Sequence, residues 1–399
     1  MISIESNDRC SGCYACAVAC PKNCIKMIAD KEGFWYPKVI EKQCVNCGVC
    51  EHICPILKHQ TPDPNQKANA IIAQNLDEKI RINSSSGGIF TLIAESIIEQ
   101  GGVVFGASFN DDFNSVQHIY VDNKADLEKL RGSKYVQSII GDTYRQAESL
   151  LKMGIKVLFT GTPCQIAGLH SYLRKSYDNL YTQDIICHGV PSPMIWKKYV
   201  EERERKAASK TYRMFFRYKK YGWKTFAVAF EFTSNAKYVK TLQEDPYMRL
   251  FHSNSCLRPS CYNCSFKTEN RQADITLADF WGVQYIVPKM DDDKGTSLVI
   301  IHSEKGVNLM KSISSFIVSQ DIDMDAVLKY NPALIQSAQK NVHREAVFER
   351  IASYDIEDIV NDLFPIKLKS KVKSVLSKIG ISNSLIKIKA IMIRGTKRS

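Results

Sequence analysis

The chain has 399 residues, of which 44% are apolar and 24% charged, a composition typical of a globular protein with two or three domains. Its net charge of +12 comes mostly from one end, because residues 366–399 hold ten Lys or Arg and no acidic residue. The rest is nearly neutral, which argues against a nucleic-acid-binding groove. No stretch is apolar enough to span a membrane, and the first residues lack the features of a signal peptide, so we expect a cytoplasmic protein.

Two cysteine runs, in residues 10–21 and 44–55, dominate the start of the chain. Both match the pattern C-x2-C-x2-C-x3-C-P, in which three cysteines bind one 4Fe-4S cluster and the fourth binds its neighbour. Structural zinc is the alternative, but paired C-x2-C knuckles do not explain eight cysteines in crossed sets. The predicted sets are Cys10, Cys13, Cys16 and Cys54 for one cluster, and Cys44, Cys47, Cys50 and Cys20 for the other.

Residues 1–60 are therefore predicted to form an α+β ferredoxin-like domain with two clusters. So small a domain has little apolar core, and we expect the clusters to supply much of its folding free energy. Cys24 lies outside both runs and is interpreted as a small apolar filler. Since paired clusters carry electrons, this domain predicts electron transfer.

Residues 61–68 are polar and contain proline, which predicts a linker. Strand-like runs follow at 70–73, 103–109, 156–160 and 184–187, with helical patterns near 88–100, 142–153, 164–176 and 192–207. Their alternation predicts a larger α/β domain over residues 69–303 with a largely parallel sheet. Residues 304–364 are expected to be helical, and residues 365–399 form a basic tail.

Several short segments of this domain stand out by composition: Ser84–Gly88, Gly132–Ser138, Gly161–Gln165, Cys187–Ser192, and Arg258–Cys264 with Ala273–Gly282. In this order they resemble the coenzyme F420 hydrogenase/dehydrogenase beta-subunit family, from the cysteine runs to about residue 300. The resemblance implies a flavoprotein domain that exchanges electrons between FAD and iron–sulfur clusters. Members with a fused ferredoxin domain also occur in bacterial surface-polysaccharide gene clusters.

The small residues at 84–88 begin a predicted helix, where backbone N–H groups and the helix dipole suit the pyrophosphate of FAD. The alternative is an ordinary serine cap with a turn. Lys134 is a candidate to neutralise phosphate or the reduced flavin, with a plain surface lysine as the alternative. The candidate FAD-binding residues are Ser84, Ser85, Ser86, Gly87, Gly88, Ser133, Lys134 and Tyr135. No G-x-G-x-x-G motif supports a nicotinamide domain.

Four cysteines of this domain are candidate ligands of a third 4Fe-4S cluster: Cys164, Cys187, Cys261 and Cys264. Cys164 and Cys187 each follow a strand-like run, and at the ends of neighbouring parallel strands they would face one crevice. Cys256 is an alternative member of the set. The other interpretations are unligated thiols, or a zinc knuckle formed by Cys256, Cys261 and Cys264.

His188 is a candidate catalytic proton donor, because two-electron reduction of an organic acceptor also requires protons, and Lys134 is the second candidate catalytic residue through its contact with the reduced flavin. A structural histidine is the alternative. Asp274, Asp279 and Trp281 are expected either to brace the fold or to line a pocket. The basic tail has the pattern of short amphipathic helices, which predicts peripheral binding to an anionic membrane, with a solvated tail as the alternative.

These features predict a cytoplasmic flavin- and iron–sulfur-dependent oxidoreductase. Reduced ferredoxin or another low-potential donor would deliver electrons through the clusters to FAD and an organic acceptor, such as a sugar or lipid-linked intermediate. A non-catalytic electron-relay subunit for a partner enzyme and an F420-dependent oxidoreductase are the alternatives.

Overall fold

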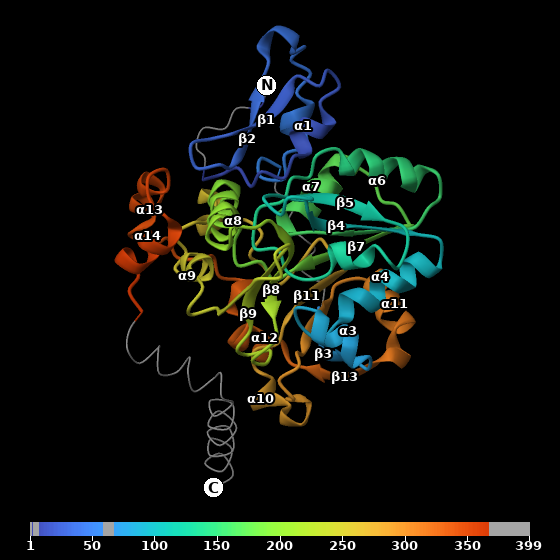
Figure 1. The fold of residues 1–399 in the computed structure, drawn as a ribbon. Coiled ribbons are helices and arrows are strands. Elements are labelled where there is room, and N and C mark those ends of the chain that lie inside the picture. Colours follow the sequence, from blue (N-terminus) through green and yellow to red (C-terminus); the bar gives the residue numbers. More distant parts are fainter. Residues whose placement is uncertain (1, 3–7, 59–67, 367–399) are drawn as a thin grey trace.

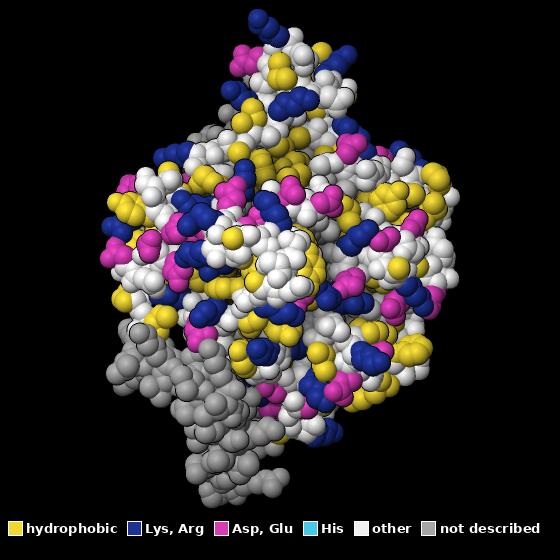
Figure 2. Space-filling view, in the orientation of Figure 1, with side chains coloured by type: hydrophobic (Ala, Val, Ile, Leu, Met, Phe, Trp, Pro, Cys, Tyr) yellow, Lys and Arg dark blue, Asp and Glu magenta, His cyan; other side chains and the backbone are white. Residues whose placement is uncertain are grey.

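The computed structural model describes residues 2, 8–58 and 68–366. The predicted linker, apart from its last residue, and the basic tail after residue 366 lie outside these residues. Within the described ranges, no helix is both long enough and apolar enough to cross a lipid bilayer. On the face drawn in Figure 2, Lys and Arg side chains are interspersed with Asp and Glu, in agreement with a nearly neutral body.

The N-terminal domain is a small α+β unit in which each cysteine run leads into one turn of helix. Each helix is entered through a left-handed residue, Tyr14 before α1 and Gly48 before α2. The strands β1 and β2 form an antiparallel hairpin, whose turn is held by two backbone N–H groups that donate to Asp30. The elements are α1 (Ala15–Ala19), β1 (Ile25–Ala29), β2 (Trp35–Val39), a 3-10 helix (Glu41–Gln43) and α2 (Val49–His52).

The body is built on an eight-stranded sheet with the strand order β13-β3-β12-β11-β7-β6-β4-β5. The strands are β3 (Asn69–Asn75), β4 (Val103–Phe109), β5 (Val116–Val121), β6 (Val157–Thr160), β7 (Leu180–Ile185), β11 (Ile275–Asp279), β12 (Ser297–Ile301) and β13 (Ile317–Ile322). A second sheet of three antiparallel strands, in the order β10-β9-β8, contains β8 (Thr211–Tyr218), β9 (Ala227–Phe232) and β10 (Lys237–Thr241).

The prediction of a largely parallel sheet was wrong, because only the four central strands, β4, β6, β7 and β11, run parallel. The strands on both sides of them are antiparallel to their neighbours. The link from β4 to β5, residues 110–115, is too short for a parallel crossover and forces an antiparallel return. The sheet is therefore mixed.

Two further predictions of elements need correction. Residues 304–364 were expected to be helical, but they include the edge strand β13. It joins the sheet through backbone pairing with β3. Its side chains are mostly exposed, so its sequence shows little of the apolar alternation that would predict a strand. The strand expected at 184–187 is β7, which begins earlier and ends at Ile185. Its start was missed because polar residues such as Gln183 are buried inside it, so the strand is not a continuous apolar run.

Helices cover both faces of the large sheet (Figure 1). Successive residues of β4 alternate between the two cores: Val104 faces the side of α4 and α11, and Phe105 the side of α6 and α7. The helices are α3 (Glu78–Asn83), α4 (Ile89–Glu99), α5 (Leu127–Leu130), α6 (Thr143–Lys152), α7 (Pro163–Leu173), α8 (Pro193–Ala207), α9 (Pro246–His252), α10 (Val283–Ile286), α11 (Glu304–Ser312), α12 (Met324–Tyr330), α13 (Arg344–Arg350) and α14 (Ile356–Leu363). Short 3-10 helices span Pro259–Asn263, Pro288–Met290, Ser314–Phe316 and Pro332–Leu334.

The N-terminal domain sits on the end of the body that carries α6 and α7 (Figure 1), and α1 packs against α7. Arg344 of α13 forms a two-pronged ion pair with Glu32 of the hairpin turn, with N–O distances of 2.7 and 2.6 Å. Ser192 also donates to the carbonyl of Glu32. These contacts are largely buried, so the hairpin is held by the body rather than free in solvent.

Candidate iron–sulfur and flavin sites

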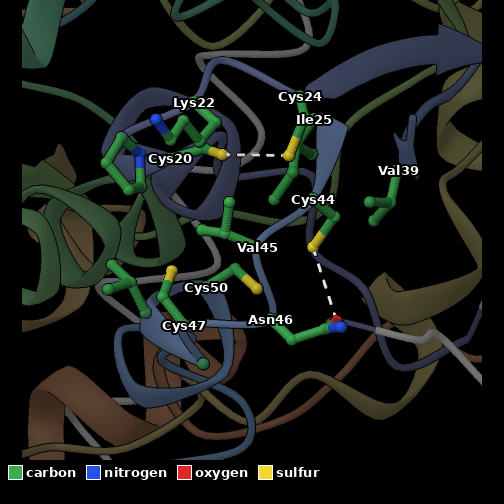
Figure 3. Close-up of a pocket in the computed structure, with 13 residues that line it drawn as sticks. Cys20, Lys22, Cys24, Ile25, Val39, Cys44, Val45, Asn46, Cys47 and Cys50 are labelled. Carbon is green, nitrogen blue, oxygen red and sulfur yellow. Dashed lines mark hydrogen bonds between the residues drawn. The ribbon is translucent and has the colours of Figure 1, made fainter. Parts of the chain in front are cut away.

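The first site, which we call the outer site, is a pocket of the N-terminal domain lined by Cys20, Cys44, Cys47 and Cys50 (Figure 3). These four are the set predicted for one cluster. Cys47 is exposed, so this pocket opens to solvent. Cys24 also lines it, with its Sγ 3.4 Å from that of Cys20, and it is buried in the small apolar cluster of this domain, so its role as an apolar filler rather than a ligand stays a prediction.

The second site, the inner site, is a cavity lined by Cys10, Cys13, Cys16 and Cys54, the other predicted set. Burial raises the pKa of the Cys13 thiol to about 12 and that of Cys16 well above its usual value. Buried thiols without a metal would stay protonated, whereas a thiol that ligates iron loses its proton and binds as the thiolate. The two pockets thus fit a cluster each, since each gathers four thiols.

A third cavity, the third site, lies in the body and is lined by Cys164, Cys187, Cys261 and Cys264. Cys164 begins α7 directly after β6, and Cys187 follows β7, the parallel neighbour of β6. Thr162 and Gln165 form a capping box that fixes the start of α7. Strand ends therefore place these thiols in one crevice, and the donor set fits a 4Fe-4S cluster.

Cys256 does not line the third cavity. It is fully buried in the apolar core around Trp196 and Leu257, and burial raises the pKa of its thiol. The structure therefore separates Cys256 from the four thiols, and a zinc knuckle that includes it has no geometric support. Ligation by the other four stays a prediction.

Two cations, Lys267 and Arg271, also line the third cavity. The Lys267 ammonium donates to the carbonyls of Cys187 and Ala333. The Arg271 guanidinium donates to the carbonyls of Phe266 and Leu334, at 2.9 and 3.1 Å. Positive charge is therefore fixed beside the thiols, where it favours their anionic form.

His188 lines the same third cavity, one residue after Cys187, and its Nε2 lies 2.6 Å from Oδ1 of Asn254. Burial lowers the pKa of this imidazole below its usual value, which favours the neutral form. Its ring edge also meets the ring of Phe251, with 5.2 Å between centroids. His188 is therefore an oriented residue beside the third site, and its role as a proton donor stays a prediction.

The inner and third cavities are adjacent, because Arg9, Ser11 and Ile56 line both of them. Gly168, one turn along α7 from Cys164, faces Cys13 of the inner site. A Cβ at Gly168 would lie 3.2 Å from the Sγ of Cys13, so only glycine allows this approach without displacement. The packing of α7 against the N-terminal domain thus joins the two sites.

The two predicted FAD-binding segments meet, since Ser85 Oγ accepts hydrogen bonds from the backbone N–H and the hydroxyl of Ser133, at 2.8 and 2.9 Å. The other groups of the first segment are used within the protein: Ser84 donates to the Ile80 carbonyl, Ser86 to Thr296, and the Gly87 N–H to Ser297. Gly88 adopts φ 83° and precedes α4. Pyrophosphate binding by this loop stays a prediction.

Basic side chains surround the meeting point of these segments. Lys134 is half-buried, donates to the carbonyls of Lys129 and Arg131, and has a pKa lowered to about 7 by desolvation. Arg217 lies 3.3 Å from the Ser85 carbonyl, and its buried Nε has no hydrogen-bond partner within the described ranges. An unsatisfied buried donor beside both loops fits an anionic group such as that of FAD.

The remaining candidate residues either hold the fold together or lie partly exposed near Arg217. Asp274 braces the sheet, because its carboxylate accepts from Thr182 of β7 and Ser303 before α11. Asp279 pairs with Arg217 at 3.0 Å and accepts from Trp223. Trp281 stacks on Trp223 and remains 38% exposed, and Tyr135 stacks on Phe251. Asp279 and Trp281 thus belong to the environment of Arg217.

Comparison with known protein families agrees with this geometry. The N-terminal model of the coenzyme F420 hydrogenase/dehydrogenase beta subunit matches residues 70–141, its C-terminal model matches residues 154–325, and a 4Fe-4S dicluster domain matches residues 9–56. The chain belongs to the coenzyme F420 hydrogenase/dehydrogenase beta-subunit family. The resemblance inferred from the sequence is thereby confirmed, and the dicluster domain implies two 4Fe-4S clusters.

Relatives of this F420 hydrogenase/dehydrogenase beta-subunit chain are distant. An uncharacterized protein of Methanocaldococcus jannaschii is 28% identical over 205 residues, which are 44% of this chain and 56% of that protein. The chain thus spans little more than half the length of this curated relative. A chain in the F420-reducing NiFe hydrogenase complex from Methanosarcina barkeri matches with a TM-score of 0.49 and 18% identity, over 73% of this chain and 95% of that one.

Sequence reasoning found Lys134 but missed the other basic residues of these sites. Lys267 and Arg271 follow the C-x2-C pair closely, and this spacing is a signal that was available. Arg217 lies on β8 among aromatic residues and has no motif of its own. Arg258, which is fully buried, donates to the carbonyl of Cys10, 248 residues earlier in the chain. Only the fold reveals that contact.

Proposed function

We propose that this protein is an iron–sulfur flavoprotein oxidoreductase, in which clusters at three sites pass single electrons from a low-potential donor such as reduced ferredoxin to FAD, which reduces an organic acceptor. The observation that carries the proposal is the adjacency of the inner and third cavities, whose walls share residues. Membership in an oxidoreductase subunit family supports it. The sugar acceptor and the membrane contact of the tail stay predictions.

The residues of the chain have distinct roles in this proposal. The outer site meets the donor, because Cys47 is exposed there. Lys134 and Arg217 bind the anionic parts of the flavin, and the hydrogen bonds between Ser85 and Ser133 hold the two loops together. The Nε2–H of His188 donates to Asn254, so Nδ1 is the ring nitrogen that would take up a proton and pass it to the acceptor.

The proposal is tested by counting iron, sulfide and flavin in protein purified without oxygen. We expect iron and sulfide for three clusters and one FAD per chain, and we expect reduced ferredoxin to bleach the flavin. Iron for only two clusters with no flavin would instead identify an electron-relay subunit. Reduction by the two-electron carrier F420 in its reduced form, but not by ferredoxin, would identify F420 as the donor.

A matched pair of variants locates the third cluster. Cys264→Ala removes a thiol that lines the third cavity, and we expect it to lower the iron content by one cluster. Cys256→Ala removes a thiol that is buried in the apolar core, and we expect the iron content to stay unchanged. Equal iron in the two variants would contradict the assignment of the third site.

A further inference from the structure

Buried positive charge differs among the three cysteine sites. The outer pocket is lined by one charged residue among those the structure describes, Lys22, and this lysine is exposed. At the inner site, the fully buried Arg258 donates from Nε to the carbonyl of Cys10 at 2.7 Å. The third cavity is lined by both Lys267 and Arg271. The inner and third sites thus each have a buried arginine, Arg258 and Arg271, and the third site has the half-buried Lys267 in addition, whereas the outer pocket has only an exposed lysine.

The cation of Lys267 is held against the ligand backbone. Its ammonium donates to the carbonyl of Cys187, a predicted ligand, and to that of Ala333 at 2.6 Å. Within the described part of the chain no carboxylate forms an ion pair with Lys267. Its ammonium therefore lies beside the cluster site and is held there by backbone carbonyls.

Arg271 is partly offset by a carboxylate. Its side chain is 2% exposed, and its guanidinium lies 3.7 Å from Asp184. Burial raises the pKa of Asp184 to about 6, so this carboxyl is still mostly ionised at neutral pH and offsets much of the Arg271 charge. Asp8 also lines the cavity, but it is exposed, so water screens its charge. The third site therefore owes its remaining positive charge mainly to Lys267.

Positive charge beside a 4Fe-4S cluster makes the cluster easier to reduce. A cluster with four thiolate ligands is an anion, and an added electron increases its negative charge, so a nearby cation stabilises the reduced form. The effect is strong for buried charges and weak for an exposed lysine that water and salt screen. Burial itself acts in the opposite direction, because it disfavours the more highly charged reduced form. The cations at the third site must outweigh this cost.

We propose that Arg258, Lys267 and Arg271 make the inner and third clusters easier to reduce than the outer cluster, so that electrons run inward from the surface. This inference rests on the three-cluster function proposed above. In each step one electron leaves one cluster and reduces the next, and no bond or proton changes hands. The low-potential one-electron donor supplies the electron at the outer site, and the flavin accepts it.

The experiment is a potentiometric titration of the full-length holoprotein, followed by paramagnetic resonance. In the native protein we expect the inner and third clusters both to be reduced at a higher potential than the outer cluster. Lys267→Met should move the third midpoint to lower potential and leave the outer midpoint unchanged. Lys267→Arg, which keeps the charge, should restore most of the shift.

Lys305→Met is the matched control. Lys305 also donates to two backbone carbonyls, those of Tyr177 and Leu180, but it lines none of the three cavities. We expect it to lower thermal stability as much as Lys267→Met does, without moving any midpoint. Equal shifts of the third midpoint in the two variants would indicate a structural effect and overturn the proposal.

Two other results would also overturn the inference. If three clusters are present but the outer one is reduced at the highest potential, inward flow is wrong while the proposed function stands. If Lys267→Met leaves the third midpoint in place, the role of its charge is wrong. A holoprotein with iron for only two clusters would reject the proposed function itself, and iron analysis detects this before any titration.

Discussion

The outer and inner sites are built from the same cysteine pattern, but the rest of the chain contacts the inner site more closely. The outer pocket includes the exposed Cys47, and none of the residues described as lining it lies in the body. At the inner site, Arg258 donates to the carbonyls of Cys10 and Trp35, and α7 packs on Cys13. The pattern specifies the ligands, whereas residues more than a hundred positions away decide solvent access and nearby charge.

Removal of one cysteine ligand from each site should have the largest effect and should show how the two sites differ. We expect Cys47→Ala and Cys13→Ala each to lose one cluster, at a cost on the order of 10 kcal/mol in the folding of the domain, as for structural metals. Only Cys13→Ala should also loosen the domain from the body, because Cys13 packs against α7. Iron analysis and limited proteolysis measure the two effects, and equal protease sensitivity would contradict the difference.

Arg258→Met should weaken the inner site alone. The change removes a buried guanidinium that donates to Cys10, Gln137 and Trp35, and we expect a loss of about 3–5 kcal/mol in unfolding free energy. Urea unfolding measures the loss, and the resonance signal of the inner cluster should change. Arg249→Met is the control, since Arg249 donates to the carbonyls of Val360 and Phe364, away from both sites, and it should leave that signal intact.

Gly168→Ala should also affect the inner site and not the outer site, with a smaller loss of stability. The new Cβ would lie 3.0 Å from the Cβ of Cys13 and 2.9 Å from the hydroxyl of Tyr144. We expect a loss of about 1–3 kcal/mol from overpacking, and a changed signal of the inner cluster only. Thermal unfolding and paramagnetic resonance check this, and a change in the outer signal instead would show that the contact was assigned to the wrong site.

The smallest expected effect is a gain in stability on the hairpin. Lys26 and Lys38 lie directly opposite each other in the antiparallel pair of β1 and β2, and like charges there are unfavourable. Lys26→Glu should therefore stabilise the protein by about 0.2–1 kcal/mol, with less effect at high salt. The control is Lys31→Glu, because Lys31 lies in the turn and has no opposing strand residue. A loss of stability in Lys26→Glu would contradict this pairing effect.

The sequence was sufficient for features that depend on local patterns. The two cysteine runs predicted both sets that line the outer and inner pockets, and the strand-like runs before Cys164 and Cys187 predicted that these thiols share a crevice. Most helix ranges were also close, because caps such as Thr162 mark a helix start locally.

Features set by distant parts of the chain were beyond sequence reasoning. Strand direction in the large sheet depends on which strands become neighbours, and β13 is an edge strand with no apolar alternation to reveal it. Lys134 gave no sign that its ammonium would be held by backbone carbonyls. The contact between Arg258 and Cys10 joins residues on different domains, so no spacing rule finds it.

The left-handed turn at Gly12 has a consequence for how the protein matures. The space where a Cβ would extend from Gly12 is filled by Gln137 and Arg258 of the body, so the docked body packs against the cysteine loop of the inner site. We expect this contact to slow the rebuilding of the inner cluster relative to the outer cluster, whose pocket includes the exposed Cys47. After oxidative damage, supply of iron and sulfide to the folded protein should rebuild the outer cluster first, and simultaneous recovery of both would contradict this order.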